Sequence, residues 1–226
     1  MDVSVIIAVR NGERFIREAI ASVFAQDVAA GEVIVVDGHS SDRTVEIVAG
    51  TPGVGVLVQS GRGVANAYNE GIRAARGEFV AFVSHDDLWT RDKLGVQFDF
   101  LRANPGLAYC TGKAVFFLEP GCAVPQGFRP GLLEGEHIAH IMETLLARRS
   151  VFEQVGFFDE TLGTAEDVDW FARAMSCGMA PEAVPQVVVR KRVHDRNISL
   201  GTDNDHNLLR AVRMALQRKR QGGAEP

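Results

Sequence analysis

The chain contains little cysteine and no long apolar run. Its three cysteines, Cys110, Cys122 and Cys177, include no Cys-x-x-Cys pair, which excludes a disulfide framework and a zinc knuckle. No stretch reaches the roughly 18 apolar residues that a membrane-spanning helix requires, and the apolar run 3–9 is too short for a signal peptide. We therefore expect a cytoplasmic protein without a transmembrane segment, for which peripheral membrane contact stays open.

Positive charge is also scarce. The chain has 24 Lys and Arg residues against 29 Asp and Glu residues, and its net charge is -5. Because domains that bind nucleic acid usually carry a basic surplus, this balance argues against a nucleic-acid partner. The length of 226 residues allows one sizeable core, so we expect a single domain.

Short apolar runs alternate with helical patterns in the first half of the chain. The runs 3–9, 33–36, 54–58 and 79–83 are typical of strands buried on both faces. Helical patterns lie between them, and repeated strand–helix units predict an α/β fold with a parallel sheet. The second half is less regular: we expect a long loop over 119–135, helices over 150–155 and 166–178, a strand over 184–193 and a helix from about 205 to 220.

Polar clusters follow three of the predicted strands, and ligands collect at the carboxyl ends of strands in such sheets. Arg10 and Asn11 follow the first strand, Asp37 the second, and Ser84-His85-Asp86-Asp87 the fourth. Adjacent acidic groups repel each other unless a cation or a donor offsets them, and their oxygens suit Mg²⁺ or Mn²⁺ shared with phosphates. For Asp87, the alternative is a cap of a helix that begins near residue 91.

Further chemistry-bearing residues each have a structural alternative. Asp37 can accept hydrogen bonds from a nucleobase or ribose, or lie in an ordinary turn. The run Gly61-Arg62-Gly63 offers backbone N–H groups and a cation to a diphosphate. One of the three carboxylates Glu166, Asp167 and Asp169 fits a general base, or all three simply favour the N-terminus of a helix. His194 fits a metal ligand or a surface histidine.

The last predicted helix has two stripes. One is apolar and the other is basic, formed by Arg210, Arg213 and Arg220. We expect this helix to dock on the domain, with an anionic membrane or a partner as the alternative.

The ordered set of motifs resembles the family 2 glycosyltransferases of the GT-A fold. The resemblance covers nearly the whole chain and is carried by residues 3–12, 19–26, 35–42, 63–72, 75–79 and 156–160, followed by Glu166-Asp167. It implies a Rossmann-like, mixed, mostly parallel sheet flanked by helices in a single domain over 1–226. Within that domain it implies a nucleotide-sugar-binding half over about 1–112, an acceptor half over about 113–204, and a C-terminal helix over 205–220.

The resemblance also implies an activity: inverting transfer of a sugar from a nucleoside-diphosphate sugar, with a UDP-sugar favoured. The acceptor would be a carbohydrate, a lipid-linked sugar or a peptide side chain. Asp167 would be the catalytic base with Glu166 beside it, and Asp86 would bind Mn²⁺ or Mg²⁺, with His194 as a further ligand. The donor-binding residues that the resemblance implies are Ala8, Arg10, Asn11, Asp37, Arg62, Asn66, Ser84, His85 and Asp86.

The chain departs from the family pattern at several positions. Ser84 stands where an aspartate is frequent, so the first position of the acidic motif cannot bind a metal through a carboxylate. Ala8 and Arg10 replace a frequent proline and an aromatic residue, although the Arg10 guanidinium can still stack on a base. Gly61 removes a side chain that related sequences can use near the base.

Two other functions compete with sugar transfer. A non-catalytic nucleotide-sugar-binding module would fit Ser84, but Glu166 and Asp167 argue against it. A nucleotidyltransferase would share the sheet and the acidic residues but would need a glycine-rich, basic first loop, which 10–14 resembles poorly. The products separate the two reactions, because one releases a nucleoside diphosphate and the other pyrophosphate.

Overall fold

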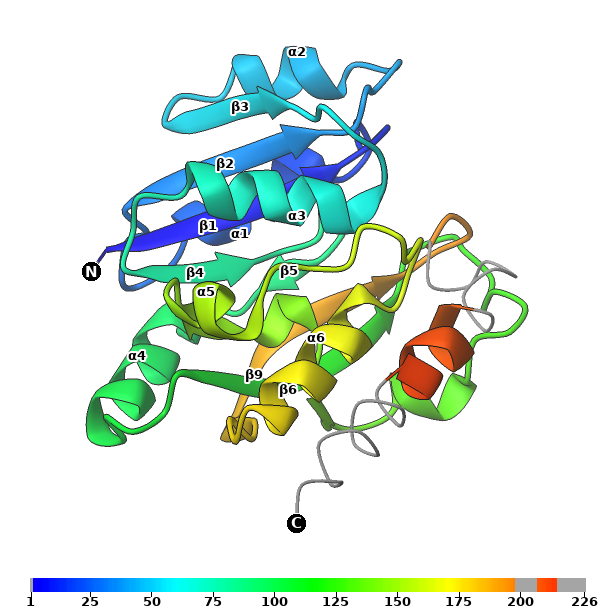
Figure 1. Ribbon diagram of the computed structural model, residues 1–226. Coiled ribbons are helices and arrows are strands. Elements are labelled where there is room, and N and C mark those ends of the chain that lie inside the picture. Colours follow the sequence, from blue (N-terminus) through cyan, green and yellow to red (C-terminus); the bar gives the residue numbers. More distant parts are fainter. Residues whose placement is uncertain (1, 198–206, 215–226) are drawn as a thin grey trace.

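The computed structural model describes residues 2–197 and 207–214. Within them, nine strands form one mixed sheet in the order β3-β2-β1-β4-β8-β6-β9-β5, with β7 paired to β6 (Figure 1). The strands are β1 (Val3–Val9), β2 (Glu32–Asp37), β3 (Val54–Val58), β4 (Phe79–Phe82), β5 (Leu88–Trp89), β6 (Tyr109–Leu118), β7 (His137–Ala139), β8 (Leu146–Arg148) and β9 (Glu182–Val193).

Helices cover both faces of the sheet. They are α1 (Ile16–Phe24), α2 (Thr44–Ala49), α3 (Gly63–Ala74), α4 (Lys93–Ala103), α5 (Val151–Val155) and α6 (Glu166–Ser176), with 3₁₀ turns η1 (Pro130–Leu133) and η2 (Met142–Thr144). Residues 207–214 are also helical. Within the described ranges, no helix is long and apolar enough to span a membrane.

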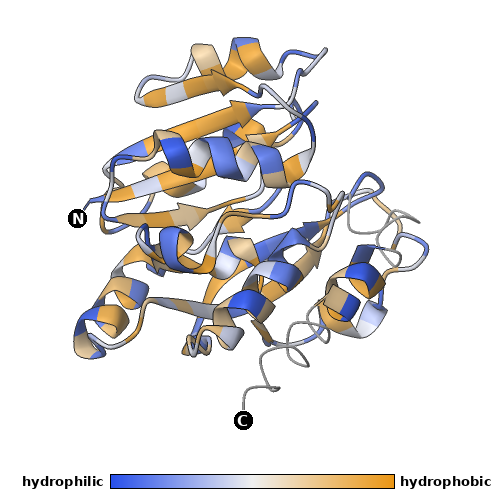
Figure 2. Ribbon diagram, viewed as in Figure 1, coloured by the Kyte–Doolittle hydropathy of each residue, from blue (hydrophilic) through white to orange (hydrophobic). Residues whose placement is uncertain are grey.

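The parallel half of the sheet follows from the apolar runs. Strand β1 pairs in parallel with β2 and β4, and β2 pairs in parallel with β3. Successive residues of β1 point to opposite faces, so Val5 and Ile7 pack in the core under α1, whereas Ile6 packs in the core under α3. Both cores are apolar along the central strands, which are orange in Figure 2. The four strands predicted over 3–9, 33–36, 54–58 and 79–83 are therefore confirmed.

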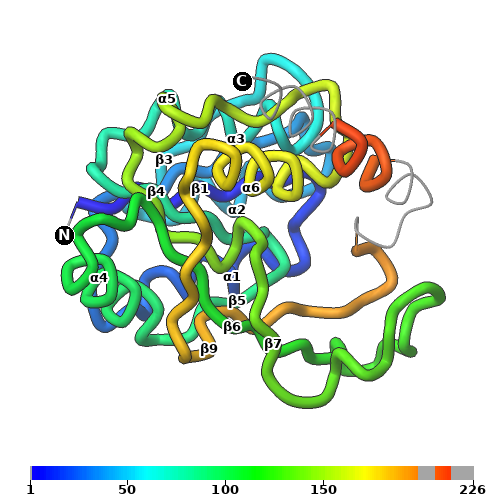
Figure 3. Tube along the Cα trace, turned by 60° about the horizontal axis from the view of Figure 1, so that its bottom comes forward, coloured from blue at the N-terminus to red at the C-terminus, as the bar shows by residue number. Residues whose placement is uncertain are grey.

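The second half adds strands of mixed direction. β8 pairs antiparallel with β4 and β6, while β6 and β9 form a long parallel ladder. The longest ladders are thus parallel, as expected, but strands β5 to β8 were not predicted. The segment 119–135 is a loop apart from η1, and it extends from the body beside β7 (Figure 3). Contacts of Lys191 and Arg192 with Asp87 hold the end of β9 near the segment that follows β4, where the polar residues gather.

Close packing of α3 on β1 requires a glycine. A Cβ atom at Gly71 would lie 2.5 Å from Cγ2 of Ile6, well inside van der Waals contact. The helix can therefore approach the sheet closely enough to bring its N-terminal residues to the carboxyl edge of β1.

Candidate active site

Two cavities open at the carboxyl edge of the sheet and share Ala8, Val64 and His85. The larger cavity, of about 810 Å³, lies over the ends of β1 and β2 and the start of α3. The second cavity, of about 430 Å³, lies between the end of β4 and the start of α6, and we call it the acidic cavity. The predicted residues from strand ends that are distant in sequence therefore meet in one region.

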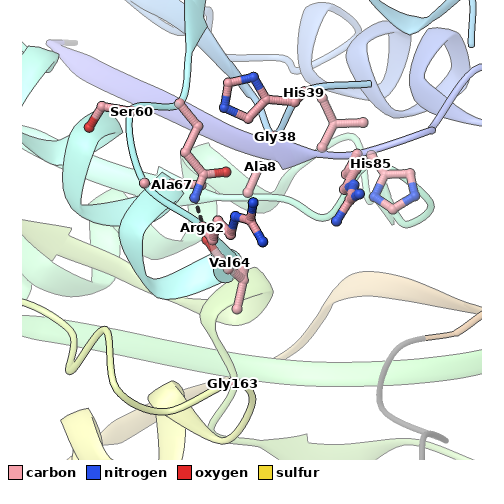
Figure 4. A pocket seen from close by; sticks show the side chains of 14 residues that line it. Ala8, Gly38, His39, Ser60, Arg62, Val64, Ala67, His85 and Gly163 are labelled. Carbon is pink, nitrogen blue, oxygen red and sulfur yellow. Dashed lines mark hydrogen bonds between the residues drawn. The ribbon is translucent and has the colours of Figure 1, made fainter. Parts of the chain in front are cut away.

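The larger cavity contains four of the residues predicted to bind a donor. They are Ala8, Arg10, Arg62 and His85. Figure 4 shows the side chains of Arg62 and His85 on different walls of this opening. The run Gly61-Arg62-Gly63 lines it as well, so a cation and the N-terminal N–H groups of α3 are available to an anionic ligand.

Asp37 ends β2 and directly precedes Gly38, which lines this cavity, whereas Asp37 itself does not line it. Its side chain is 3% exposed, and its Oδ2 atom accepts a hydrogen bond from the Ser40 amide at 3.1 Å. Its Oδ1 atom is buried without a hydrogen-bond partner in the described part of the chain. Because an unsatisfied buried acceptor costs about 1–3 kcal/mol, Oδ1 is suited to a ligand that brings an N–H or O–H donor.

Two other predicted donor-binding residues bond to neighbouring loops. The side-chain oxygen of Asn11 accepts a hydrogen bond from the Ser41 backbone amide at 2.8 Å, and the backbone amide of Asn11 donates a hydrogen bond to the Ser40 hydroxyl. Asn66 accepts one from the Gly61 amide at 3.1 Å and donates to Glu160. Both asparagines therefore hold neighbouring loops in place, and their predicted contact with a donor stays a prediction.

The contact between Gly61 and Asn66 explains why position 61 is a glycine. A Cβ atom there would lie 2.7 Å from Cγ of Asn66. Any larger residue would therefore disturb the contact that holds the loop before α3.

Backbone strain is concentrated around the cavities. Among the described non-glycine residues, positive φ angles occur at Asn11 (55°), His39 (61°) and Ala165 (63°). His39 lines the larger cavity and Ala165 the acidic cavity. Conformations of this kind persist where the surrounding structure enforces them, which is common at binding sites.

Asp86, which lines the acidic cavity, contacts His194 although the two residues are far apart in sequence. His194 is 3% exposed, and its Nε2 atom lies 3.1 Å from Oδ2 of Asp86; the alternative of a surface histidine is therefore wrong. Burial alone would raise the pKa of Asp86, but the hydrogen bond with His194 and the charges of His85 and Lys191 lower that pKa to about 2. Asp86 is therefore an ionised carboxylate at neutral pH.

This pair fits a divalent cation only together with ligand oxygens. In residues 2–197 and 207–214, no group of three or more His, Cys, Asp or Glu side chains forms a complete metal site. However, Mg²⁺ commonly takes one or two carboxylates and completes its shell with phosphate oxygens and water, and imidazole suits transition metals. The Asp86 carboxylate at the edge of the cavity is compatible with that donor set, whereas the imidazole of His194 would first have to exchange its hydrogen bonds with Asp86 and the Arg196 amide.

Asp87 is not a helix cap. The residues after it form β5, and α4 begins only at Lys93. Its Oδ1 atom accepts a hydrogen bond from the Arg192 amide at 2.9 Å, and its Oδ2 atom lies 2.7 Å from Nζ of Lys191. Asp87 therefore ties the end of β4 to β9, and the helix-cap alternative is wrong.

Two charged residues of the acidic cavity were missed by sequence reasoning: Glu143 on η2 and Lys191 on β9. Glu143 accepts a hydrogen bond from Ser84 Oγ at 2.5 Å and pairs with Lys191 Nζ at 3.0 Å. Burial alone would lower the pKa of Lys191, but the charges of Asp87 and Glu143 outweigh it and raise that pKa above its usual range. No local pattern signals this network, because its members come from separate segments.

Glu166 and Asp167 start α6 and line the acidic cavity. Burial and the neighbouring Asp167 charge raise the pKa of Glu166 to about 8, and burial with the Glu143 charge raises that of Asp167 to about 6. Asp169 of the same turn is buried in an ion pair with Arg173 at 2.8 Å. A carboxylate whose pKa lies near neutrality is suited to general base catalysis, which favours Asp167.

The described part of the last helix docks on the domain. Ala211 is fully buried, Leu208 lines the acidic cavity, and Arg210 donates hydrogen bonds to Thr161. Arg213 is exposed, whereas Arg220 lies outside the described residues.

Comparisons with a family model and with known sequences agree on one family. The model described as "Glycosyl transferase family 2" matches residues 4–156. An uncharacterised glycosyltransferase of Rickettsia typhi is 32% identical over 209 residues, which cover 85% of this chain and 64% of the relative. The succinoglycan biosynthesis protein ExoO of Rhizobium meliloti is 30% identical over 224 residues, covering 91% of this chain and 64% of that protein. The chain thus spans less than two thirds of the length of these relatives.

Solved structures share the fold. TarS 1-349 of S. aureus in complex with UDP-GlcNAc matches with a TM-score of 0.70 at 21% identity, over 95% of this chain and 65% of that one. The same protein in complex with UDP matches with a TM-score of 0.67 at 20% identity, over the same shares. At this identity the likeness concerns the fold, and it confirms the α/β fold class predicted from the sequence.

Proposed function

The chain belongs to glycosyl transferase family 2, and from this premise we propose that it transfers a sugar from a UDP-sugar to an acceptor hydroxyl with inversion of configuration. The observation that carries the proposal is the pair of joined cavities. One has the cation of Arg62 in its wall and, next to its wall residue Gly38, the partnerless Oδ1 atom of Asp37, and the other holds the proposed base, whose pKa is raised. The reacting groups would meet where the cavities share Val64 and His85.

The donor would lie in the larger cavity. Oδ1 of Asp37 accepts a hydrogen bond from the imide N–H of uracil, the guanidinium of Arg10 stacks on the base, and Arg62 with the start of α3 binds the diphosphate. Two solved TarS structures hold UDP and UDP-GlcNAc, which supports a UDP-sugar as the donor. Because these proteins are only 20% and 21% identical to this chain, the support extends to the fold and not to single residues.

The chemistry is a single displacement. The acceptor oxygen attacks the anomeric carbon, and the bond from that carbon to the diphosphate oxygen breaks with its electron pair leaving on the diphosphate. Asp167 takes the acceptor proton. The products are the glycosylated acceptor with inverted configuration and UDP, and Asp167 then releases its proton to solvent.

The residues Asp86 and His194 would hold the cation, Mn²⁺ or Mg²⁺. When bound, such a cation neutralises the charge that develops on the departing diphosphate. Arg192 supports this position, because its Nε atom donates a hydrogen bond to the Asp86 carbonyl oxygen at 2.9 Å. Ser84 has no carboxylate with which to bind the cation, and its hydroxyl donates a hydrogen bond to Glu143.

A thermal-shift screen of nucleotide sugars with and without Mn²⁺ tests the proposal. A donor at ~100 times its dissociation constant should add roughly 2.7 kcal/mol to the unfolding free energy. Stabilisation by UDP-sugars, followed by release of UDP rather than pyrophosphate on turnover, separates this function from nucleotidyl transfer. Stabilisation without any turnover would favour the binding module, and no shift with any donor and metal would refute the proposal.

Asp86→Ala should remove the metal dependence of donor binding. The variant lacks the ionised carboxylate that pairs with His194, so we expect Mn²⁺ to add nothing to its UDP affinity in calorimetry. Equal Mn²⁺ enhancement in the variant and the wild type would exclude Asp86 as a cation ligand.

Asp37→Ala should weaken UDP binding by about tenfold, the loss of roughly 1.4 kcal/mol, and should lower the free energy of unfolding by only about 1 kcal/mol. The stability cost is small because Oδ2 accepts a single hydrogen bond, from the Ser40 amide, whereas Oδ1 has no hydrogen-bond partner in the described part of the chain until uracil is bound. Calorimetric titration with UDP measures the first effect and urea unfolding the second. Unchanged affinity would remove Asp37 from base recognition.

A further inference from the structure

The side chain of Arg192 is buried near the end of β9, outside the lining of both cavities. All three nitrogen atoms of its guanidinium group have partners. Nε donates a hydrogen bond to the Asp86 carbonyl oxygen at 2.9 Å, Nη2 donates one to Glu18 at 2.7 Å, and Nη1 donates one to Glu119. Because the guanidinium group is planar and rigid, these bonds fix its three partners relative to one another.

Two aromatic rings enclose this guanidinium group. Its Cζ atom lies 4.6 Å from the centre of the Phe15 ring and 5.0 Å from that of the Phe117 ring. A cation is attracted to the face of an aromatic ring, and the attraction is stronger where water is excluded. Arg192 is only 5% exposed, so the two rings add to the bonds that keep it in one orientation.

The segment 83–87, which carries Asp86, lies between β4 and β5 and belongs to neither strand. Its backbone is therefore fixed by contacts outside the strand pairing of the sheet. Arg192 makes two of them: its backbone amide donates to Oδ1 of Asp87 and its Nε atom to the carbonyl oxygen of Asp86, both at 2.9 Å. The direction of the Asp86 side chain therefore depends on Arg192.

His194 is held from the same residue by two routes. Its ring centre lies 4.8 Å from that of Phe15, the ring that also contacts the Arg192 guanidinium group. Its backbone amide donates a hydrogen bond to Asn197 at 2.7 Å, and the side-chain amide of Asn197 donates one to the Arg192 carbonyl oxygen at 3.0 Å. Arg192 thus contacts the surroundings of both residues proposed to hold the cation.

Glu119 links Arg192 to the loop 119–135, of which it is the first residue. Burial alone would raise the pKa of Glu119, but the hydrogen bond and charge of Arg192 and the charge of Arg14 lower that pKa. Arg14 lies 3.2 Å from the other carboxylate oxygen, and the Glu119 amide donates to the Val193 carbonyl oxygen at 2.9 Å. The loop, which projects beside β7 (Figure 3), therefore begins at a fixed ion pair with Arg192.

We propose that Arg192 is a positioning residue that orients Asp86 and His194 for Mn²⁺ or Mg²⁺. Glu119 holds its guanidinium group in place, which links the loop 119–135 to the strength of cation binding. The inference rests on the proposed function, because that function assigns Asp86 and His194 to the cation. Residues that orient metal ligands typically change metal affinity about 10–100-fold when they are altered.

Arg192→Lys tests the inference, because lysine keeps the positive charge but presents its donors from a single nitrogen atom. The measurement is a titration of Mn²⁺ into the UDP-saturated protein, followed by thermal unfolding. We expect the Mn²⁺ concentration for half-maximal stabilisation to rise at least about tenfold. The dissociation constant of UDP in EDTA, measured by calorimetry, should be unchanged, since Arg192 lines neither cavity.

Glu119→Gln is the second variant, and it retains the ion pair of Arg192 with Glu18, so it should fold. A neutral amide accepts a weaker hydrogen bond than a carboxylate, so we expect a shift of at least about threefold in the same direction. The matched controls are Arg102→Lys and Glu136→Gln, which alter exposed ion pairs elsewhere and should leave both values unchanged.

An unchanged Mn²⁺ response in Arg192→Lys would overturn the inference, as would an equal loss of UDP affinity in EDTA, which would mean a general structural role. An unchanged response in Glu119→Gln would overturn the link to the loop, and would decide against the whole inference if Arg192→Lys does not fold. A wild type that UDP stabilises without any effect of Mn²⁺ would also overturn the inference but leave sugar transfer standing. Failure of UDP to stabilise the wild type would instead refute the proposed function.

Discussion

Asp167→Asn should strongly reduce turnover while leaving donor binding intact. A general base typically contributes about 10²–10⁴-fold to the rate, and an amide cannot take the acceptor proton, so we expect kcat to fall within that range. UDP affinity should stay within about twofold of the wild type, because Asp167 lines the acidic cavity and not the larger one. Initial rates of UDP release and calorimetric titration with UDP measure the two effects.

The matched control is Glu153→Gln, which changes an exposed carboxylate on α5 away from both cavities. It should leave kcat unchanged. Parallel losses of turnover and UDP affinity in Asp167→Asn would remove this residue from the role of base.

The pH dependence of wild-type kcat/KM provides a second test of Asp167 as the base. Burial and the charge of Glu143 raise the pKa of Asp167 to about 6. The base must be deprotonated to act, so kcat/KM should be constant above that pKa and fall as pH decreases through it. An acid limb near the ordinary aspartate pKa of about 3.9 would contradict the assignment, as would persistence of the limb in Asp167→Asn.

The sequence predicted those parts of the site whose position is set by the end of a strand. Asp37 and Asp86 could be placed at one sheet edge because each directly follows a buried parallel strand, and such ends gather on the same edge. His194 could be added to this site only through the family resemblance, because nothing in residues 182–193 indicates which strand this segment pairs with. Its contact with Asp86 follows from the pairing of β9 with β5 and β6.

Glu143 and Lys191 could not be predicted for a related reason. Lys191 lies 104 residues from Asp87 along the chain, and Glu143 belongs to a three-residue turn with no repeating pattern. The missed strand β6 has a different cause. Its ladder with β9 contains register shifts around Lys113, which interrupt the alternation that marks a strand. Strand β5 has only two residues and is too short for any pattern.

Lys191→Met should be the most destabilising change at the site. Lys191 is the shared ion-pair partner of Asp87, whose side chain is 1% exposed, and of Glu143, whose side chain is 12% exposed. Removing one partner of a buried ion pair leaves uncompensated charge and costs about 3–5 kcal/mol. The exposed pair of Lys113 and Glu136 supplies the control, because Lys113→Met should cost no more than about 1 kcal/mol. Urea unfolding of both variants measures the difference.

The pH dependence of that loss distinguishes charge repulsion from lost packing. Without the ammonium, Asp87 and Glu143 face each other in a buried site, so their pKa values in the folded variant should lie above those in the unfolded chain. The folded variant then binds more protons than the unfolded one, and its stability falls as pH rises. We therefore expect a larger deficit relative to the wild type at pH 8 than at pH 5, whereas an equal deficit at both would mean that Lys191 stabilises the site by packing and not by its charge.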